Sequence, residues 1–296
     1  MDKTHASPDG EKKVQPGQEP PSPAAMAALD KLREILRATG PMAIGFSGGV
    51  DSTFLLKVAV DVLGRSAVAI TTVSASLAAS EKEETIVLAR LIGAEHHLVP
   101  SGELDDPAYR ENTPRRCFFC KSELFRILRE QALARSLGAI VYGAQKDDLG
   151  EFRPGMEAAA GHGARAPLIE AGMGKAEVRA WSRALGLPTW DKPAMACLAS
   201  RIAHGTMVSV EALGRVERAE RSVRQEGFIL FRVRAKGSEA RLEVSREEIR
   251  RLDDERLRDR LARGILSSGF ASVTFDPRGY RPGGGALLPE APDERR

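Results

Sequence analysis

Short apolar runs alternate with segments of helical spacing along the first part of the chain. Short segments rich in apolar residues and bounded by turn residues are typical of strands. Strands are expected at residues 42–46, 67–73, 96–99 and 139–142. Apolar residues at helical spacing predict helices at residues 26–36, 53–63, 80–92, 121–137 and 175–185. Because strands that alternate with helices form right-handed βαβ units around a parallel sheet, the expected fold class is α/β.

The pattern changes after Gly186-Leu187-Pro188, which ends the last of these helices. Residues 190–206 are expected to form an irregular loop that carries function, and the first domain is expected to span residues 25–206. A small α+β domain for substrate binding or oligomerisation is expected over 207–282, built from helices at 209–225 and 246–261, two strands around the turn 236–238 and a strand at 271–275. Residues 1–24 and 283–296 are expected to be disordered tails.

Composition narrows the class of protein. A chain of 296 residues with 42% hydrophobic and 29% charged residues can bury the cores of two domains. Its net charge of +3 gives no strong nucleic-acid or membrane footprint. No apolar segment has the length of a membrane span, and the N-terminal residues lack the apolar stretch of a signal peptide, so the expected compartment is the cytoplasm. Three cysteines cannot all pair, which favours thiol or metal chemistry over a disulfide framework.

The segment Ser47-Gly48-Gly49-Val50-Asp51-Ser52 lies between an expected strand and an expected helix. Two glycines let the backbone approach an anion closely, and the free amides at the helix N-terminus point toward it. The segment lacks the Gly-Lys-Ser/Thr ending of a Walker A motif, whose lysine reaches the β- and γ-phosphates. The pattern therefore favours a nucleotide chemistry that releases pyrophosphate over γ-phosphoryl transfer.

The cysteines form the second candidate site. Cys117 and Cys120 are three residues apart just before an expected helix, and Cys197 follows much later. Three converging thiols fit an iron–sulfur cluster with one open iron, a zinc site that takes a further ligand, or redox-active or structural thiols. The neighbouring Arg115 and Arg116 are expected to lower the pKa of these thiols.

The glycine-rich segment resembles the PP-loop of ATP pyrophosphatases, and further segments make the resemblance closer: residues 116–121, 143–148 with 153–155, 196–201 and 279–281 together resemble the LarE family. That resemblance implies a Rossmann-like PP-loop domain of the adenine nucleotide alpha hydrolase type. It also implies an ATP-dependent sulfur transferase that adenylates a carboxylate of pyridinium-3,5-biscarboxylic acid mononucleotide, with release of pyrophosphate and AMP, and replaces an oxygen with sulfur. The product would serve the nickel-pincer nucleotide cofactor of lactate racemase.

The same resemblance assigns roles to residues. Binding of the ATP phosphates falls to Ser47, Gly48, Gly49 and Ser52, with Asp51 on Mg2+ and Gly143 in the nucleotide segment. Cys197 would be either a sacrificial sulfur donor or, with Cys117 and Cys120, a ligand of a 4Fe-4S cluster that receives inorganic sulfide or sulfur from a donor protein. Ser200 and Arg201 would orient substrate. Phosphate groups or metal ions would be bound by Arg232, Arg234, Arg281, Glu220 and Glu243. A trimer-based homo-oligomer is also implied.

Several alternatives stay open from the residues alone. Arg232 and Arg234 also fit a solvated strand face with an ion pair to Glu243 across the turn. A tRNA-thiolating PP-loop enzyme would bind tRNA in a salt-dependent way, although no basic or zinc-ribbon appendage is present. An amide-forming enzyme and an ATP sensor with structural zinc are further alternatives. Asp147 and Asp148 are expected either to cap a loop or to contact the nucleotide. His96 and His97 are expected to be structural, and Trp181 and Trp190 are expected to pack in the core.

Overall fold

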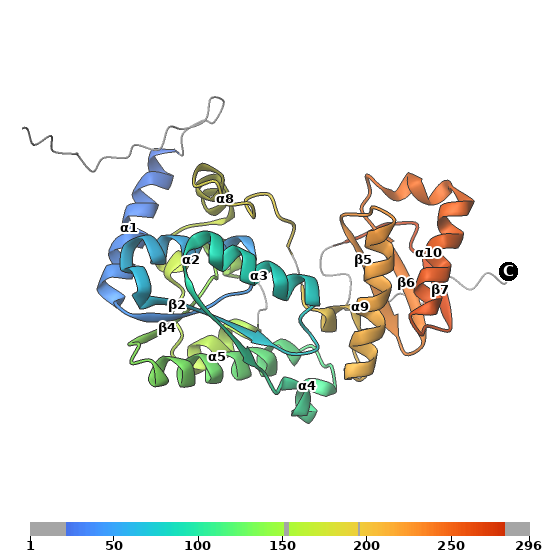
Figure 1. The fold of residues 1–296 in the computed structure, drawn as a ribbon, viewed down its shortest axis with the longest axis horizontal. Helices are drawn as coiled ribbons and strands as arrows, with labels where there is room; N and C mark the ends of the chain where they lie inside the picture. Colours follow the sequence, from blue (N-terminus) through green and yellow to red (C-terminus); the bar gives the residue numbers. More distant parts are fainter. Residues whose placement is uncertain (1–21, 151–153, 195, 282–296) are drawn as a thin grey trace, which may run out of the picture.

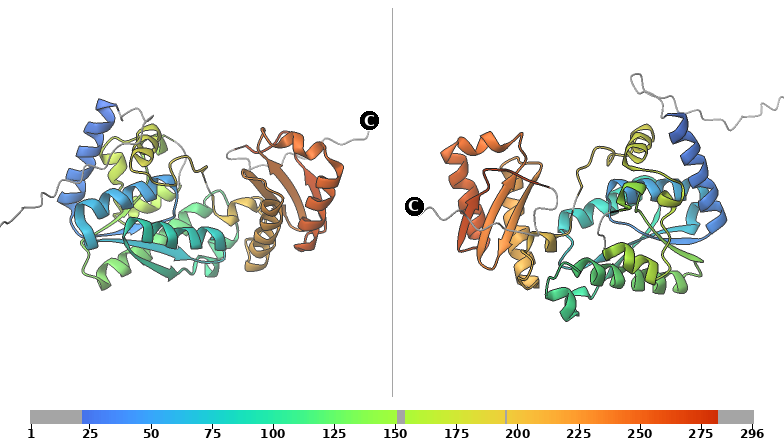
Figure 2. Two further views of the ribbon diagram at one scale, coloured as in Figure 1. Left: turned by 45° about the horizontal axis from the view of Figure 1, so that its top comes forward. Right: turned by 180° about the vertical axis from the view of Figure 1, so that it is seen from behind.

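The computed structural model describes residues 22–150, 154–194 and 196–281, and it has two lobes (Figure 1). The larger lobe holds a four-stranded parallel sheet in the order β3-β2-β1-β4. The smaller lobe holds a three-stranded sheet in the order β5-β6-β7. Figure 2 shows the same two lobes from two further directions. The expected fold class, an α/β domain with a parallel sheet followed by a smaller α+β unit, is confirmed.

The elements of the larger lobe are as follows. Its strands are β1 (Met42–Gly45), β2 (Ala67–Val73), β3 (Glu95–Pro100) and β4 (Ala139–Tyr142). Its longer helices are α1 (Pro23–Thr39), α2 (Val50–Leu63), α3 (Ala79–Ile92), α5 (Arg116–Ala134) and α8 (Lys175–Ala184), and its short ones are α4 (Pro107–Arg110), α6 (Pro154–Gly161) and α7 (Pro167–Glu170). In the described ranges, no helix has the length and apolar character needed to cross a membrane.

Side chains that alternate along β1 build a core on each face of the sheet. Met42 and Ile44 belong to the cluster that α1, α2 and α8 cover, whereas Ala43 belongs to the cluster formed with Phe125 and Leu128 of α5. Figure 1 accordingly shows α2 and α3 on one side of the sheet and α5 on the other. The central strand is thus buried on both faces, as expected for a parallel sheet.

The smaller lobe consists of α9 (Val210–Gln225), β5 (Phe231–Lys236), β6 (Glu239–Val244), α10 (Glu255–Ser267) and β7 (Ser272–Phe275). β5 and β6 form an antiparallel hairpin, and β7 joins β6 in parallel. The core of this lobe also includes Tyr109 and Leu198, which come from the chain of the larger lobe and the connecting segment. The two lobes therefore share a hydrophobic cluster at their junction.

Residues 196–208 connect the lobes and are hydrogen-bonded to both. The amide of Leu198 donates to the carbonyl of Ser76 in the larger lobe at 2.9 Å, and the amide of Ala203 donates to the carbonyl of Ala235 on β5 at 2.9 Å. The side-chain amide of Asn112, a fully buried residue, donates to the carbonyls of Ala203 (2.8 Å) and Thr206 (2.9 Å). These bonds fix the segment that carries Cys197.

Two sequence predictions of helix bounds are wrong. The helix expected at 246–261 is a 3-10 turn at Ile249–Asp253 followed by α10, because the side chain of Asp254 caps a new helix by accepting from the amides of Arg256 (2.9 Å) and Leu257 (3.2 Å). α5 begins at Arg116, so the cysteine pair lies inside its first turns rather than before it.

α1 begins at Pro23, where Ser22 caps it, so the last residues of the expected tail 1–24 belong to the folded body. Residues 1–21 and the whole of the expected tail 283–296 lie outside the described residues. Arg153, part of the family-like segment 153–155, also lies outside them.

Candidate active site

The PP-loop segment turns tightly between β1 and α2. The hydroxyl of Ser52 donates to the carbonyl of Gly49 at 3.2 Å and accepts from the amide of Ser47 at 3.3 Å. Gly48 has a φ of 68°, which glycine adopts without the strain that a side chain would add. The 14-residue helix α2 begins one residue after Gly49, with no side-chain cap on its first amides. The loop therefore presents the positive end of a long helix to an anion.

Gly143, directly after β4, lies against this loop. A Cβ at this position would come within 2.8 Å of both the Cα and the amide nitrogen of Ser52, and neither backbone atom can turn aside as a side chain can. Only glycine lets the two segments approach so closely. The assignment of Gly143 to nucleotide binding stays a prediction, and its place beside Ser52 gives that prediction a physical basis.

Gly143→Ala is therefore expected to push the PP-loop out of position. We expect a loss of unfolding free energy of about 1–3 kcal/mol from overpacking, together with at least tenfold weaker binding of ATP, on the order of 1.4 kcal/mol. Urea unfolding and titration calorimetry measure the two effects. Gly138→Ala is the matched control, because the nearest atom to its Cβ would be a carbonyl oxygen at 3.7 Å, an ordinary contact. Equal behaviour of the two variants would contradict the steric argument.

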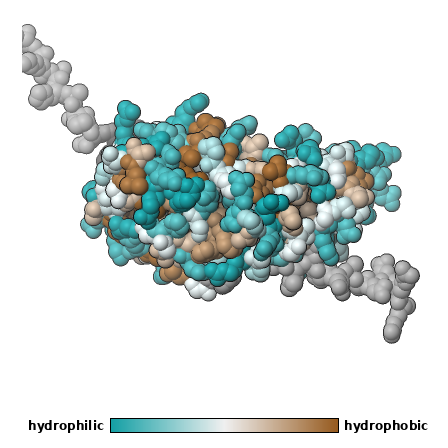
Figure 3. Space-filling model, turned by 90° about the horizontal axis from the view of Figure 1, so that it is seen from below, coloured by the Kyte–Doolittle hydropathy of each residue, from teal (hydrophilic) through white to brown (hydrophobic). Residues whose placement is uncertain are grey.

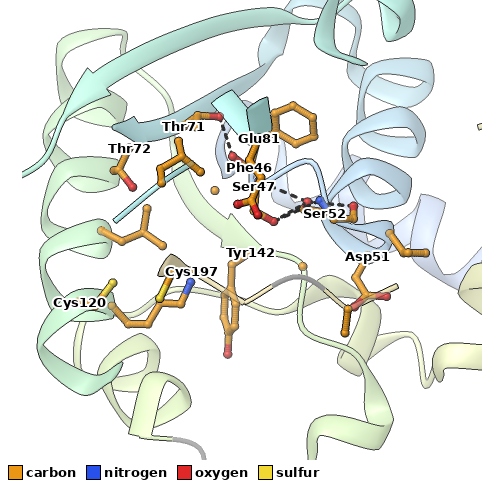
Figure 4. Close-up of a pocket in the computed structure, with 18 of the residues that line it drawn as sticks. Phe46, Ser47, Asp51, Ser52, Thr71, Thr72, Glu81, Cys120, Tyr142 and Cys197 are labelled. Atoms are coloured by element: carbon orange, nitrogen blue, oxygen red, sulfur yellow. Dashed lines mark hydrogen bonds between the residues drawn. The ribbon is translucent and has the colours of Figure 1, made fainter. Parts of the chain in front are cut away.

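A cavity of about 590 Å³ joins the PP-loop to the cysteines. Seven of the residues predicted from sequence line it: Ser47, Gly49, Asp51, Ser52, Gly143, Cys120 and Cys197. Figure 4 shows Cys120 and Cys197 beside each other on one side of this cavity, with Ser47, Ser52 and Asp51 across from them. Gly48 and the exposed Cys117 are not part of the lining. Two of the three thiols therefore face the same space as the loop.

The cysteine pair lies one turn apart on α5. Burial raises the pKa of the Cys120 thiol to about 12, and Lys121 opposes that shift only in part. The expected lowering by the neighbouring arginines is therefore wrong for Cys120. Arg115 instead pairs with Glu157 at 2.9 Å, and the buried Arg116 donates to the carbonyl of Ala199 at 2.8 Å. Both guanidinium groups are engaged away from the thiol.

The different surroundings of the two α5 thiols predict different reactivity in the metal-free protein. Cys117 is exposed, whereas Cys120 has a pKa near 12 and carries little thiolate at neutral pH. We expect alkylation of Cys120 by iodoacetamide at pH 8 to be at least about tenfold slower than that of Cys117, and to accelerate as the pH rises. Peptide mass spectrometry after timed quenching measures both rates. Equal rates would contradict the burial of Cys120.

Convergence of all three thiols on one ion stays a prediction. Among the described residues, no group of three histidine, cysteine or acidic side chains is placed to hold a metal ion. Close to the thiols, Tyr109 is only 1% exposed, and its hydroxyl has no partner in hydrogen-bonding geometry within the described ranges. Burial and the nearby Cys197 and Cys120 raise the pKa of Tyr109. Sequence reasoning missed this residue, because nothing in the local pattern connects it to the cysteines.

The connecting segment and β5 carry two buried ion pairs. Arg201 donates to Glu220 on α9 at 2.9 and 3.1 Å, and Arg234 donates to Glu243 on β6 at 2.9 Å. All four side chains are at most 6% exposed. The interpretation of this strand face as solvated is therefore wrong, although the ion pair across the hairpin exists.

The arginines also hold backbone carbonyls. Arg201 donates to the carbonyls of Ala196 and Cys197, the latter at 3.0 Å, and Arg234 donates to the carbonyl of Ser200 at 3.1 Å. Arg232 donates to the carbonyl of Ala194 at 3.1 Å. Burial and the nearby Arg201 lower the pKa of Arg232. These contacts place the arginines around the backbone that carries Cys197, whereas Arg281 lies half-buried at the end of the described chain.

The remaining residues fall as follows. Asp148 accepts from the amide of Gln145 at 3.0 Å and Asp147 accepts from the amide of Lys175 at 2.7 Å, so both cap loops while also lining the cavity. His96 bonds to the Thr71 hydroxyl at 2.8 Å and His97 to Glu95 at 2.9 Å. Trp181 donates to the carbonyl of Ala25, whereas Trp190 is 37% exposed under Arg183, so the packing prediction is wrong for Trp190.

Comparison with known proteins gives three relatives. The chain is 44% identical over 255 residues to an uncharacterized protein of Synechocystis, and the alignment covers 86% of this chain and 95% of that protein. It is 35% identical over 214 residues to the pyridinium-3,5-bisthiocarboxylic acid mononucleotide synthase of Lactiplantibacillus plantarum, over 72% of this chain and 76% of that enzyme. An uncharacterized protein of Methanocaldococcus jannaschii is 28% identical over 134 residues, 45% of this chain and 52% of its own. No protein-family model matches the chain.

Proposed function

The chain belongs to the LarE family, and from that membership and its cavity we propose that it is an ATP-dependent sulfur transferase. It adenylates a carboxylate of pyridinium-3,5-biscarboxylic acid mononucleotide and replaces an oxygen with sulfur to give a thiocarboxylate. The observation that carries the proposal is the single cavity lined by the PP-loop and by Cys120 and Cys197. Activation of a carboxylate and attack by sulfur need different groups within reach of one substrate, and this cavity has both.

The first step uses the loop. A carboxylate oxygen of the substrate attacks the α-phosphorus of ATP, the bond to the β-phosphate oxygen breaks, and pyrophosphate leaves. Amides of the PP-loop and the N-terminus of α2 stabilise the negative charge on the phosphates. Asp51, on the first turn of α2 and in the cavity wall, would hold the Mg2+ that screens them.

The second step uses sulfur. A carboxylate alone is a poor electrophile, whereas its adenylate has AMP as a leaving group. When Cys197 itself is the donor, its thiolate attacks the carbonyl carbon, and AMP leaves with the former carboxylate oxygen. Loss of the Cα proton of Cys197 then breaks the Cβ–Sγ bond, which releases the thiocarboxylate and leaves dehydroalanine at this position. Arg201 holds the carbonyl of Cys197 and Arg234 holds that of Ser200, so these side chains fix the donor segment in place.

A 4Fe-4S cluster fits the donor set of this chain. Thiolates are the ligands that such clusters take, Cys117 and Cys120 are one helical turn apart, and Cys120 shares the cavity wall with Cys197. When bound by three cysteines, the cluster would supply an open iron that can carry sulfide. Cys197 as a sacrificial donor is the alternative form of the same transfer.

The substrate phosphate would bind at the arginines of β5 and the end of the described chain. Arg234 is already paired with Glu243, whereas Arg232 makes no ion pair in the described ranges and donates to two carbonyls, at 2.7 and 3.1 Å. Arg232 is therefore better placed to gain a phosphate partner than Arg234. Glu220 pairs with Arg201, and Glu243 pairs with Arg234. These pairs support a role of both carboxylates in holding the arginines rather than in binding a metal ion.

The test is a reaction with protein purified and reconstituted without oxygen. Incubation with ATP, Mg2+, sulfide and the pyridinium dicarboxylate mononucleotide is expected to form AMP, pyrophosphate and a thiocarboxylate that mass spectrometry identifies. Iron and sulfide analysis of the same sample is expected to give about four of each per chain for the cluster form. A protein without iron that transfers one sulfur per chain would support the sacrificial form instead. Absence of AMP and of thiocarboxylate would overturn the proposal.

A further inference from the structure

Lys192 reaches the PP-loop from a distant part of the chain. Its ammonium donates to the carbonyl of Gly48 at 3.0 Å and to the carboxylate of Glu84 on α3 at 2.7 Å. The lysine and the glycine are 144 residues apart in sequence. Lys192 also lines the cavity that the loop and the cysteines share. A positive charge therefore lies directly beside a loop whose own sequence contains no lysine.

Arg179 fixes the position of this lysine. Its guanidinium, on α8, donates to the carbonyl of Trp190 at 2.7 Å and to the carbonyl of Lys192 itself at 2.8 Å. The amide of Lys192 donates to the carbonyl of Thr189 at 3.0 Å. The backbone of Lys192 is thus held on both sides, which fixes the point from which its side chain reaches the PP-loop. Arg179 is in this sense a positioning residue.

The present partner of Lys192 is easily exchanged. The side chain of Glu84 is 39% exposed, whereas that of Lys192 is 16% exposed. An ion pair to a carboxylate this accessible to water is weak because solvent screens it. A polyphosphate carries several charges and more acceptor oxygens than a carboxylate, so it competes well for the same ammonium.

We propose that Lys192 binds the phosphates of ATP that leave as pyrophosphate, and so supplies from another part of the chain the cation that a Walker A motif carries within its loop. The inference rests on the proposed function, because it presumes that the PP-loop binds ATP. Glu84 holds the ammonium at the loop when no nucleotide is present, and it loses this partner to the phosphates. Lys192 would then stabilise the charge that builds up on the leaving pyrophosphate.

Calorimetric titration of the full chain with three probes tests the assignment: ATP with Mg2+, pyrophosphate with Mg2+, and AMP. Lys192→Met is expected to weaken the binding of ATP and of pyrophosphate by about 10- to 100-fold, the effect of one charged hydrogen bond. Binding of AMP, which lacks the leaving phosphates, is expected to change by less than about twofold. Glu84→Gln is expected to act in the opposite direction and tighten ATP binding by about two- to fivefold, because it removes the competitor.

The matched control is Lys57→Met, which removes the same charge from α2, where Lys57 pairs with Asp61 and is not part of the cavity lining. Its ATP affinity is expected to stay that of the wild type. Equal losses for ATP and AMP in Lys192→Met, or no loss for ATP, would overturn the inference. If that variant does not fold, Glu84→Gln decides, since unchanged or weaker ATP binding contradicts the competition. A wild-type chain that binds no ATP would overturn the proposed function itself, a different result from binding that Lys192 does not influence.

Discussion

Cys197→Ala is expected to lower sulfur transfer by at least about a thousandfold, because it removes the proposed sulfur-bearing group from the cavity. Adenylation is expected to continue, since the PP-loop lies across the cavity from Cys197 (Figure 4). AMP formed by hydrolysis of the adenylate, and thiocarboxylate formed by transfer, are measured in the same reaction by chromatography and mass spectrometry. The variant is expected to form AMP without thiocarboxylate.

The Cys117→Ala variant separates the two forms of the sulfur donor. Cys117 is exposed and does not line the cavity, so a sacrificial role of Cys197 predicts transfer close to that of the wild type. A cluster held by all three thiols predicts loss of iron, and of repeated turnover, in both variants. Full thiocarboxylate formation by Cys197→Ala would contradict any role of this thiol as donor or ligand.

Arg201→Met is expected to lower the free energy of unfolding by about 3–5 kcal/mol, the usual effect of leaving one member of a buried ion pair without its partner. Glu220 is 4% exposed, and among the described residues its carboxylate would keep the hydrogen bond from the amide of Val233, at 3.1 Å, but no ion pair. The carbonyl of Cys197 would also lose a donor at 3.0 Å. Urea unfolding measures the stability change, and a fall in the melting temperature of about 10 °C is the corresponding thermal effect.

Two comparisons make this prediction specific. Arg33→Met breaks an exposed pair with Asp30, whose side chain is 70% exposed, and is expected to cost less than about 1 kcal/mol. Adding Glu220→Leu to Arg201→Met is expected to recover part of the lost stability, because the unpaired buried charge is removed. A stability of Arg201→Met within the range of the Arg33 variant would show that Arg201 is not needed for packing and would leave substrate orientation as its only role.

Hydrophilic and apolar residues are mixed on the face of the molecule that Figure 3 shows. The net charge of +3 is small for a chain of 296 residues, and the absence of a strong electrostatic footprint stays a prediction from the sequence. Exposed apolar residues on α3, Val87 and Leu91, are each 62% exposed. Scattered surface apolar residues are normal in soluble proteins.

Local sequence was sufficient for the sheet and for its loop. β1 and β4 are continuous apolar runs and β2 begins with one, whereas β3 includes Glu95, His96 and His97. An apolar run is a local property of the sequence, so it can be recognised without the fold. The turn from Ser47 to Ser52 needs a positive φ at Gly48, which glycine adopts readily, so the residue type alone indicates the turn. The helix expected at 246–261 shows where prediction from local sequence fails. Asp254 can either continue that helix or cap a new one, and the helical spacing of the apolar residues does not distinguish the two.

The sequence by itself determined the alternating α/β architecture, the position of the PP-loop and the family of the chain. Each of these three features can be recognised from residues that are neighbours in the sequence. Only the tertiary structure decided that Lys192 meets Gly48 and that Arg201 pairs with Glu220 rather than facing open solvent. It also decided that Cys120, and not Cys117, faces the cavity with Cys197. The physical reason is that burial and charge pairing depend on distance in space, and residues far apart in the sequence give no local signal of it.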